Sequence, residues 1–178
     1  MQGITESRYQ TKEWRRDQHW YDNGGKSNEC ENYQRRVIEE TLGVKLPKTH
    51  IRLNTVDYGM YTKSNPLTER GGFDFTEDFD GILNVGDSKL YFNLKMVCSS
   101  GGAQTRTLRE VYHFILAQHN HLLECCEDVG DTFFVNIIDG DQGYKYTQDG
   151  EIASLKDVRL HKKYKSIKDN VYIGDLKG

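Results

Sequence analysis

Two stretches in the middle of the chain alternate apolar and polar residues, and this alternation constrains the fold more than any other feature. They are residues 73–85 and 89–97, separated by the turn-forming residues Gly86, Asp87 and Ser88. A period of two places successive side chains on opposite faces of a strand, and a short glycine-containing connection joins antiparallel neighbours. The sequence therefore predicts a β-hairpin with one face on a core.

The alternation also predicts which side chains of this hairpin share a face. The first strand has Phe73, Phe75, Phe79 and Leu83 on one side, and Asp74, Thr76, Asp78 and Asp80 on the other. The second strand has Leu90, Phe92, Leu94 and Met96 on one side, and Tyr91, Asn93, Lys95 and Val97 on the other. If both apolar faces lie on one core, Asp80, Asn93 and Lys95 point the same way from adjacent strands.

Helical periodicity is clear in two other segments. Residues 27–42 carry apolar side chains at helical spacing and are followed by Gly43, which is typical of a helix end. Residues 104–123 carry a longer apolar stripe at positions three and four apart. Two helices are therefore expected, one on each side of the predicted hairpin in the chain.

Shorter elements complete the expected fold. Strands are predicted at 50–57 and 131–138, followed by a turn at 139–143, a return strand at 144–147 and a short helix after Asp149. At 178 residues, the length favours a single domain over residues 1–178. The expected class is α/β, with a central mixed β-sheet flanked by helices.

Composition excludes some function classes. The formal net charge of −3 provides no general attraction to nucleic acid, so any DNA-binding surface has to come from local patches. The first twenty residues are polar and no stretch approaches the length of a membrane span, so no membrane partner and a cytoplasmic location are expected.

The polar cluster on the hairpin suggests a particular chemistry. Hydrolysis of a phosphodiester needs a divalent metal on hard oxygen ligands, a group that holds or deprotonates the attacking water, and positive charge near the phosphate. An Asp on one strand and a Lys on the next supply two of these. The segment TEDFDG at 76–81, followed by YFNLKMV at 91–97, resembles the signature of the PD-(D/E)XK nuclease superfamily, which includes most type II restriction enzymes.

The resemblance implies a restriction-endonuclease-like fold and a role for each matching position. Asp80 matches the metal-binding Asp, Lys95 the lysine that orients and activates water, and Leu94 the residue whose main-chain carbonyl completes the metal site. Asn93 occupies the position that is acidic in the family, so it is expected as an amide ligand. Glu31, on the predicted first helix, matches a glutamate that this helix often contributes.

The implied function is Mg²⁺-dependent cleavage of double-stranded DNA, sequence-specific as in a restriction enzyme. A loop of small residues opens the second helix, and its N-terminal part suits phosphate or base contacts. The expected DNA-binding residues are Ser99, Ser100, Gln104, Arg106 and Arg109. Small size and the two-fold symmetry of palindromic sites favour a homodimer.

Two alternatives stay open at this stage. One is a structure-selective nuclease such as a junction resolvase, and the other is a catalytically inactive DNA-binding module of the same fold, which Asn93 favours. The group that replaces the missing acid is also open. Asn93 ranks first, supported by Glu31, ahead of Asp78 and Glu110.

Overall fold

The structure is a computed structural model, and it describes residues 3–21, 28–62, 76–98, 101–149 and 162–178. Among these residues, the α-helices are α1 (Lys12–Arg16), α2 (Glu29–Leu42), α3 (Gly102–Glu124) and α4 (Asp141–Asp149). The strands are β1 (Ile51–Asn54), β2 (Met60–Thr62), β3 (Thr76–Asp78), β4 (Gly81–Val85), β5 (Ser88–Met96), β6 (Thr132–Asp139) and β7 (Val171–Gly174). Short 3-10 helices are η1 (Ser7–Tyr9), η3 (Val129–Asp131) and η4 (Lys162–Asn170). No described helix is long and apolar enough to cross a membrane.

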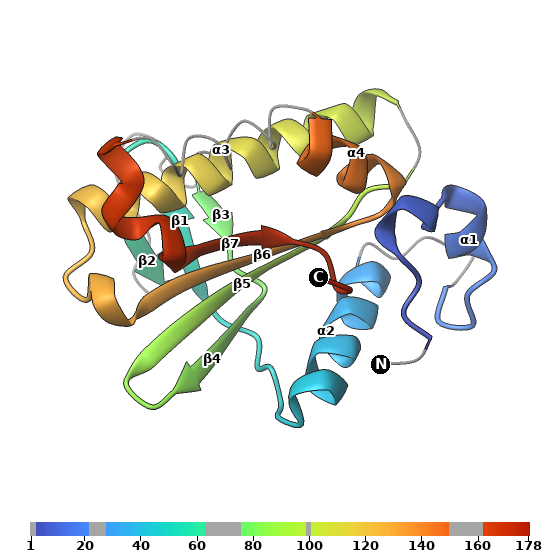
Figure 1. Cartoon of the computed structure of the whole chain (residues 1–178), viewed down its shortest axis with the longest axis horizontal. Coiled ribbons are helices and arrows are strands. Elements are labelled where there is room, and N and C mark those ends of the chain that lie inside the picture. The colour runs from blue at the N-terminus through green and yellow to red at the C-terminus, as the bar shows by residue number, and fades with distance from the viewer. Residues whose placement is uncertain (1–2, 22–27, 63–75, 99–100, 150–161) are drawn as a thin grey trace.

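The strands form two sheets instead of the single one expected. The larger sheet has the order β4-β5-β6-β7, with β4 antiparallel to β5 and the other neighbours parallel. The smaller sheet has the order β2-β1-β3 and is antiparallel. Helix α3 connects β5 to β6 and lies over one face of the larger sheet, while α2 lies against the other face (Figure 1). The α/β class with mixed sheet and flanking helices is confirmed in this coarse form.

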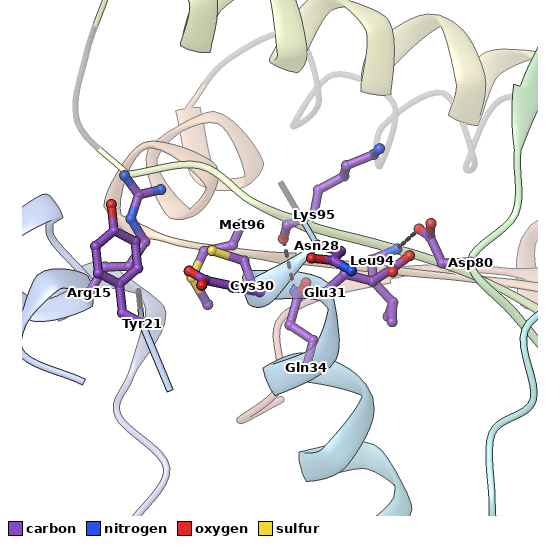
Figure 2. Close-up of a pocket in the computed structure, with 11 residues that line it drawn as sticks. Arg15, Tyr21, Asn28, Cys30, Glu31, Gln34, Asp80, Leu94, Lys95 and Met96 are labelled. Atoms are coloured by element: carbon purple, nitrogen blue, oxygen red, sulfur yellow. Dashed lines mark hydrogen bonds between the residues drawn. The ribbon is translucent and has the colours of Figure 1, made fainter. Parts of the chain in front are cut away.

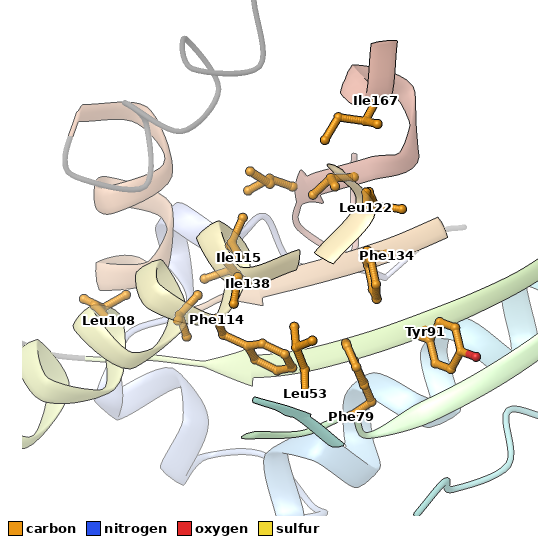
Figure 3. Packing of buried hydrophobic residues seen from close by; sticks show 14 of the residues in the cluster. Leu53, Phe79, Tyr91, Leu108, Phe114, Ile115, Leu122, Phe134, Ile138 and Ile167 are labelled. Carbon is orange, nitrogen blue, oxygen red and sulfur yellow. The ribbon is translucent and has the colours of Figure 1, made fainter. Parts of the chain in front are cut away.

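The larger core lies between α3 and the sheet, and aromatic rings fill its centre (Figure 3). The ring of Phe79 stacks on Phe134 at 5.4 Å between centroids and contacts Phe114 at 4.9 Å. A second cluster under α2 contains Ile38, Phe92 and other apolar side chains. Burial of apolar area on both faces makes the larger sheet the rigid centre of the molecule.

The predicted strand at 73–85 is interrupted. Residues 73–75 lie outside the described residues, and the remainder divides into β3 and β4, which belong to different sheets. Gly81 pairs with Phe92, and the backbone N–H of Asp80 also donates to the Phe92 carbonyl at 2.8 Å. Two residues of one strand therefore face one residue of the other, which defines a β-bulge.

The bulge corrects the predicted facing of the first strand. An extra residue reverses the side-chain alternation beyond it. Two residues that are an even number of positions apart therefore no longer lie on the same face when the bulge is between them. Phe79 lies in the core under α3, whereas Leu83, expected on the same face, packs with the cluster under α2. Phe92 and Leu94 also belong to the α2 cluster.

The helices predicted at 27–42 and 104–123 are confirmed as α2 and α3, and the strands at 89–97 and 131–138 as β5 and β6. The turn at 139–143 and the return strand at 144–147 are wrong, because Asp141 begins α4. Gly140, with a φ of 92°, ends β6 and allows the chain to turn into this helix. β7 was not predicted. Of the region after Asp149, the structure describes only residues from Lys162 onward.

Gly140 provides a stability test. A Cβ at this position would lie 2.2 Å from the Val97 carbonyl oxygen, whereas nothing lies within 4 Å of a Cβ at Gly86, although Gly86 also has a positive φ of 60°. Gly86→Ala should cost about 1 kcal/mol, and Gly140→Ala about 3 kcal/mol or more, in the free energy of unfolding measured in urea. Equal costs for the two variants would contradict this account.

Candidate active site

Asp80 is held in place at the bulge from several sides. Its carboxylate accepts a hydrogen bond from the backbone N–H of Leu94 at 2.7 Å, so the side chain replaces a missing strand partner of β5. The guanidinium of Arg35 donates to the Asp80 carbonyl and, at 2.7 Å, to the carbonyl of Leu46. A Cβ on Gly81 would lie 2.9 Å from the Leu46 side chain, which explains a glycine directly after Asp80.

Glu31 reaches Asp80 from the opposite side. It lies in the first turn of α2, and its side chain is hydrogen-bonded to the Asp80 carboxyl. Arg35, one turn further along α2, lies 3.8 Å from a Glu31 carboxylate oxygen. The helix therefore presents a carboxylate and a guanidinium to the bulge, and it is positioned by Ile38, which packs in the cluster with Phe92.

Burial, and after it the pairing with Glu31, perturb the protonation of Asp80. Together, burial and the hydrogen bond with Glu31 raise the pKa of Asp80 to about 8, against the opposing effects of the Lys95 charge and of the hydrogen bond from the Leu94 N–H. At neutral pH, Asp80 therefore holds a proton that its hydrogen bond to Glu31 stabilises. Such pairs are common where a protein binds cations or performs acid-base chemistry.

Lys95 extends from β5 away from α2, on the side of the sheet that α3 covers (Figure 2). Its charge lowers the pKa of both Asp80 and Glu77, the middle residue of β3. Burial is the largest influence on Glu77 and raises its pKa, as does the charge of Glu110 on α3. Lys95 therefore lies near two carboxyl groups, that of Glu77 in β3 and that of Asp80 between β3 and β4.

Sequence reasoning missed Glu77. The alternation placed the even-numbered residues 74–80 on the polar face, so Glu77 fell on the predicted core face. The structure pairs Glu77 with Leu53 in the smaller sheet, which gives β3 neighbours that the hairpin model did not include. Asp78, weighed as a substitute acid, instead forms an ion pair with Arg52 at 2.9 Å.

Two cavities meet at Asp80 and Lys95. The first, of about 450 Å³, is lined by these two residues and by Arg15, Tyr21, Asn28, Glu29, Cys30, Glu31, Gln34, Leu94 and Met96 (Figure 2). The second, also of about 450 Å³, is lined by Arg52, Thr76, Glu77 and Asp78 in addition to the shared pair. The predicted residues Asp80, Lys95, Leu94 and Glu31 thus come together at one concave site.

Asn93 does not belong to this group. Its side chain is fully buried and lines neither cavity. The amide nitrogen donates to Asn136 on β6 at 3.1 Å, and Asn136 forms two hydrogen bonds with Gln118 on α3. The predicted shared facing of Asp80 and Asn93 fails because the bulge turns Asp80 toward the strand edge, while Asn93 stays under α3.

The predicted DNA-binding residues are only partly described. Ser99 and Ser100 lie outside the described residues, and Gln104, Arg106 and Arg109 lie in the N-terminal part of α3. Both arginines are exposed, and neither lines the two cavities. Arg106 precedes Glu110 by one helical turn, so the two residues share a face of α3. The charge of Glu110 contributes to the raised pKa of Glu77, so this face is directed toward the second cavity.

The perturbed pKa of Asp80 predicts a dependence of stability on pH. The native protein retains a proton that an unfolded Asp releases above about pH 4, so this group costs stability progressively as pH rises from about 4 to about 8. Asp80→Asn mimics the protonated carboxyl. Its Tm should therefore exceed that of the wild type by at least about 2 °C at pH 8, and the difference should shrink at pH 5.

The matched control is Asp87→Asn, which changes an exposed carboxylate in the β4–β5 turn. It should leave the pH dependence of Tm unchanged. A difference between Asp80→Asn and the wild type that is the same at pH 5 and pH 8 would show that the Asp80 carboxyl does not titrate in this range.

Comparison with known proteins provides no independent identification of the site. The chain matches no protein-family model, no curated protein and no solved structure. The assignment of a function therefore depends on the residues and on the geometry described above.

Proposed function

We propose that the protein is a metal-dependent endonuclease of restriction-endonuclease-like fold that hydrolyses phosphodiester bonds of double-stranded DNA. The observation that carries the proposal is the carboxyl pair of Asp80 and Glu31 beside Lys95, where two cavities meet. The order of the elements also supports it, since Asp80 precedes β4, Lys95 lies on the adjacent β5, and α3 follows.

The donor set fits Mg²⁺. Among the described residues, no three His, Cys, Asp or Glu side chains converge as a metal-binding group. Mg²⁺ does not need such a group, because it keeps several waters and is held by one or two carboxylates together with substrate phosphate. Asp80 and Glu31 would hold the ion, with the Leu94 carbonyl as a third oxygen. A cation would replace the proton that now holds the two carboxyl groups together.

Each residue then has a chemical task. A bound Mg²⁺ supplies Lewis-acid stabilisation of charge on the phosphate. Lys95 provides a positive charge and hydrogen-bond donors beside the phosphate and the attacking water. Hydrolysis adds this water to phosphorus and breaks one P–O ester bond, which leaves a phosphomonoester and a free hydroxyl. Glu77, near Lys95 in the second cavity, can accept the proton that the water loses.

DNA contact and assembly complete the proposal. Arg106 and Arg109 are exposed on α3 and suit the phosphate backbone on the side of the second cavity. Sequence-specific cleavage by a homodimer follows from the same resemblance and belongs to the proposal, with a structure-selective nuclease as the variant of the same chemistry.

A catalytically inactive DNA-binding module is the second candidate. Asn93 favours it, because the position that is acidic in the resembling family carries an amide here, and this amide is committed to Asn136. In that case the Asp80–Glu31 pair would be structural. A cleavage assay separates the two candidates.

Cleavage should depend on the paired residues. Lys95→Met and Asp80→Asn should each lower the rate of plasmid cleavage in Mg²⁺ by at least about a hundredfold, the effect of losing a key catalytic group, while DNA binding is retained. The matched controls are Lys89→Met, an exposed lysine on the same strand, and Asp87→Asn. Both controls should cleave as the wild type does.

The cleavage products distinguish a sequence-specific nuclease from a structure-selective one. Discrete fragments indicate sequence-specific cleavage, and cutting confined to branched substrates indicates a structure-selective enzyme. If the wild type binds DNA but cleaves neither substrate in Mg²⁺ or Mn²⁺, the nuclease is excluded and the inactive module is supported.

A further inference from the structure

We propose that the end of the first cavity remote from Asp80 binds an unpaired nucleotide, with its phosphate at Arg15 and its base stacked on Tyr21. Figure 2 shows Arg15 and Tyr21 together at one end of the cavity and Asp80 at the other, with Lys95 and Glu31 between them. The inference rests on the proposed nuclease function for its substrate class, because it names which part of a DNA strand lies beside the cleaved bond.

This end of the cavity is built by a segment that is firmly attached to the sheet. Gln10 is fully buried, and its side chain accepts a hydrogen bond from the Gly140 N–H at 2.8 Å. Its carbonyl accepts from Asp141 at 2.9 Å. Thr11 then caps α1 by accepting from the Trp14 N–H at 3.1 Å. Arg15 is therefore presented by a helix that is anchored where β6 ends.

Tyr21 belongs to a preorganised aromatic cluster. Its ring packs edge-on against Trp20 at 6.4 Å between centroids, and Trp20 stacks on Tyr33 of α2 at 4.7 Å. Trp14 contacts both Trp20 and Tyr33 at 6.1 Å. A ring held in this way loses little conformational freedom when a base stacks on it, which favours binding.

Arg15 places a charge over one face of the Tyr21 ring, which leaves the other face for a base. Its guanidinium lies 5.6 Å from the centroid of the Tyr21 ring. Burial raises the pKa of Cys30, and the charge of Arg15 and a side-chain hydrogen bond with Arg15 oppose this rise, so the guanidinium acts on the interior of the cavity. Its Nε is buried and has no hydrogen-bond partner within the part of the chain that the structure describes. A phosphate in the cavity would therefore be bound by the charge and the terminal nitrogens of the guanidinium, which form charge-assisted hydrogen bonds with phosphate oxygens.

The charge arrangement favours a strand over a small anion. Among the described residues that line this cavity, the cations are Arg15 and Lys95, which lie at separate places along it, and the acidic residues are Glu29, Glu31 and Asp80. Two separated cations suit two phosphates of one strand, one at the cleaved bond and one at Arg15. A base that stacks on Tyr21 cannot also be stacked in a duplex, so this nucleotide has to be unpaired.

Binding without metal tests the subsite independently of cleavage. Fluorescence anisotropy in EDTA would compare a blunt duplex with the same duplex carrying a single-stranded tail, at either the 3′ or the 5′ end. The wild type should bind one tailed duplex more tightly than the blunt one. Tyr21→Leu should weaken binding of that duplex about tenfold and leave the blunt duplex unaffected, whereas Tyr21→Phe, which keeps the ring, should bind as the wild type does.

The charge is tested in the same assay. Arg15→Gln should reduce the dependence of tailed-duplex affinity on salt by about one unit of slope, as expected when one phosphate contact is lost. The matched control is Arg16→Gln, which changes an exposed arginine on the same helix that does not line the cavity. In Arg16→Gln, the difference in salt slope between the tailed and the blunt duplex should be the same as in the wild type.

Several outcomes would overturn the proposal. Equal affinity of the wild type for tailed and blunt duplexes, or equal loss of both in Tyr21→Leu, excludes a subsite for an unpaired nucleotide. If only the nuclease proposal is wrong, the result is different. The wild type would then cleave no DNA but would still bind the tailed duplex more tightly than the blunt one, and this preference would depend on Tyr21. Conversely, cleavage that depends on Lys95 without any effect of Tyr21 would retain the nuclease and reject the subsite.

Discussion

The hydrogen bond between the Asp80 carboxylate and the Leu94 N–H is the contact on which the arrangement of the site depends. β5 is longer than β4, so its end has backbone groups without a strand partner on that side, and a buried N–H without an acceptor is costly. The bulge supplies an acceptor by turning Asp80 onto the strand edge. It also allows the chain to leave one sheet and enter the other, with Phe79 in the core on one side and Asp80 at the cavity on the other.

The position of Asp80 at this contact also lowers the stability of the folded protein. A carboxyl group that is largely removed from water and placed against Glu31 is disfavoured in its charged form, and its pKa of about 8 expresses that cost. The charged form of Asp139 is disfavoured in the same way, because burial raises the pKa of Asp139 to about 7. Gln34 donates to both Asp139 and the Lys95 carbonyl, at 2.8 and 2.9 Å. Buried polar groups thus hold the β5 backbone on both sides of Lys95, and stability is reduced where chemistry is proposed.

Segments far apart in the chain meet around β5. The N-terminal segment reaches the end of β6 through Gln10, α2 contributes Glu31, and β3 contributes Glu77 from the smaller sheet. The N-terminal segment brings a guanidinium and an aromatic ring to the first cavity, α2 brings a carboxyl group to the same cavity, and β3 brings a carboxyl group to the second cavity. In the proposed function, a phosphate binds at the centre of this site and the DNA strand runs along the cavities in both directions from it.

The sequence by itself determined the α/β class, the two long helices, the Gly86–Asp87 hairpin and the association of Asp80 with Lys95, because helical and strand periodicity and turn residues are local properties. Only the tertiary structure decided that the strand at 73–85 divides between two sheets, that 144–147 is helical, that Glu77 faces Lys95 and that Asn93 is buried against Asn136. One inserted residue at Asp80 reverses the alternation beyond it, and whether a chain bulges depends on the partners that it finds across the sheet. Those partners lie far away in sequence, so a period read along one strand cannot reveal them.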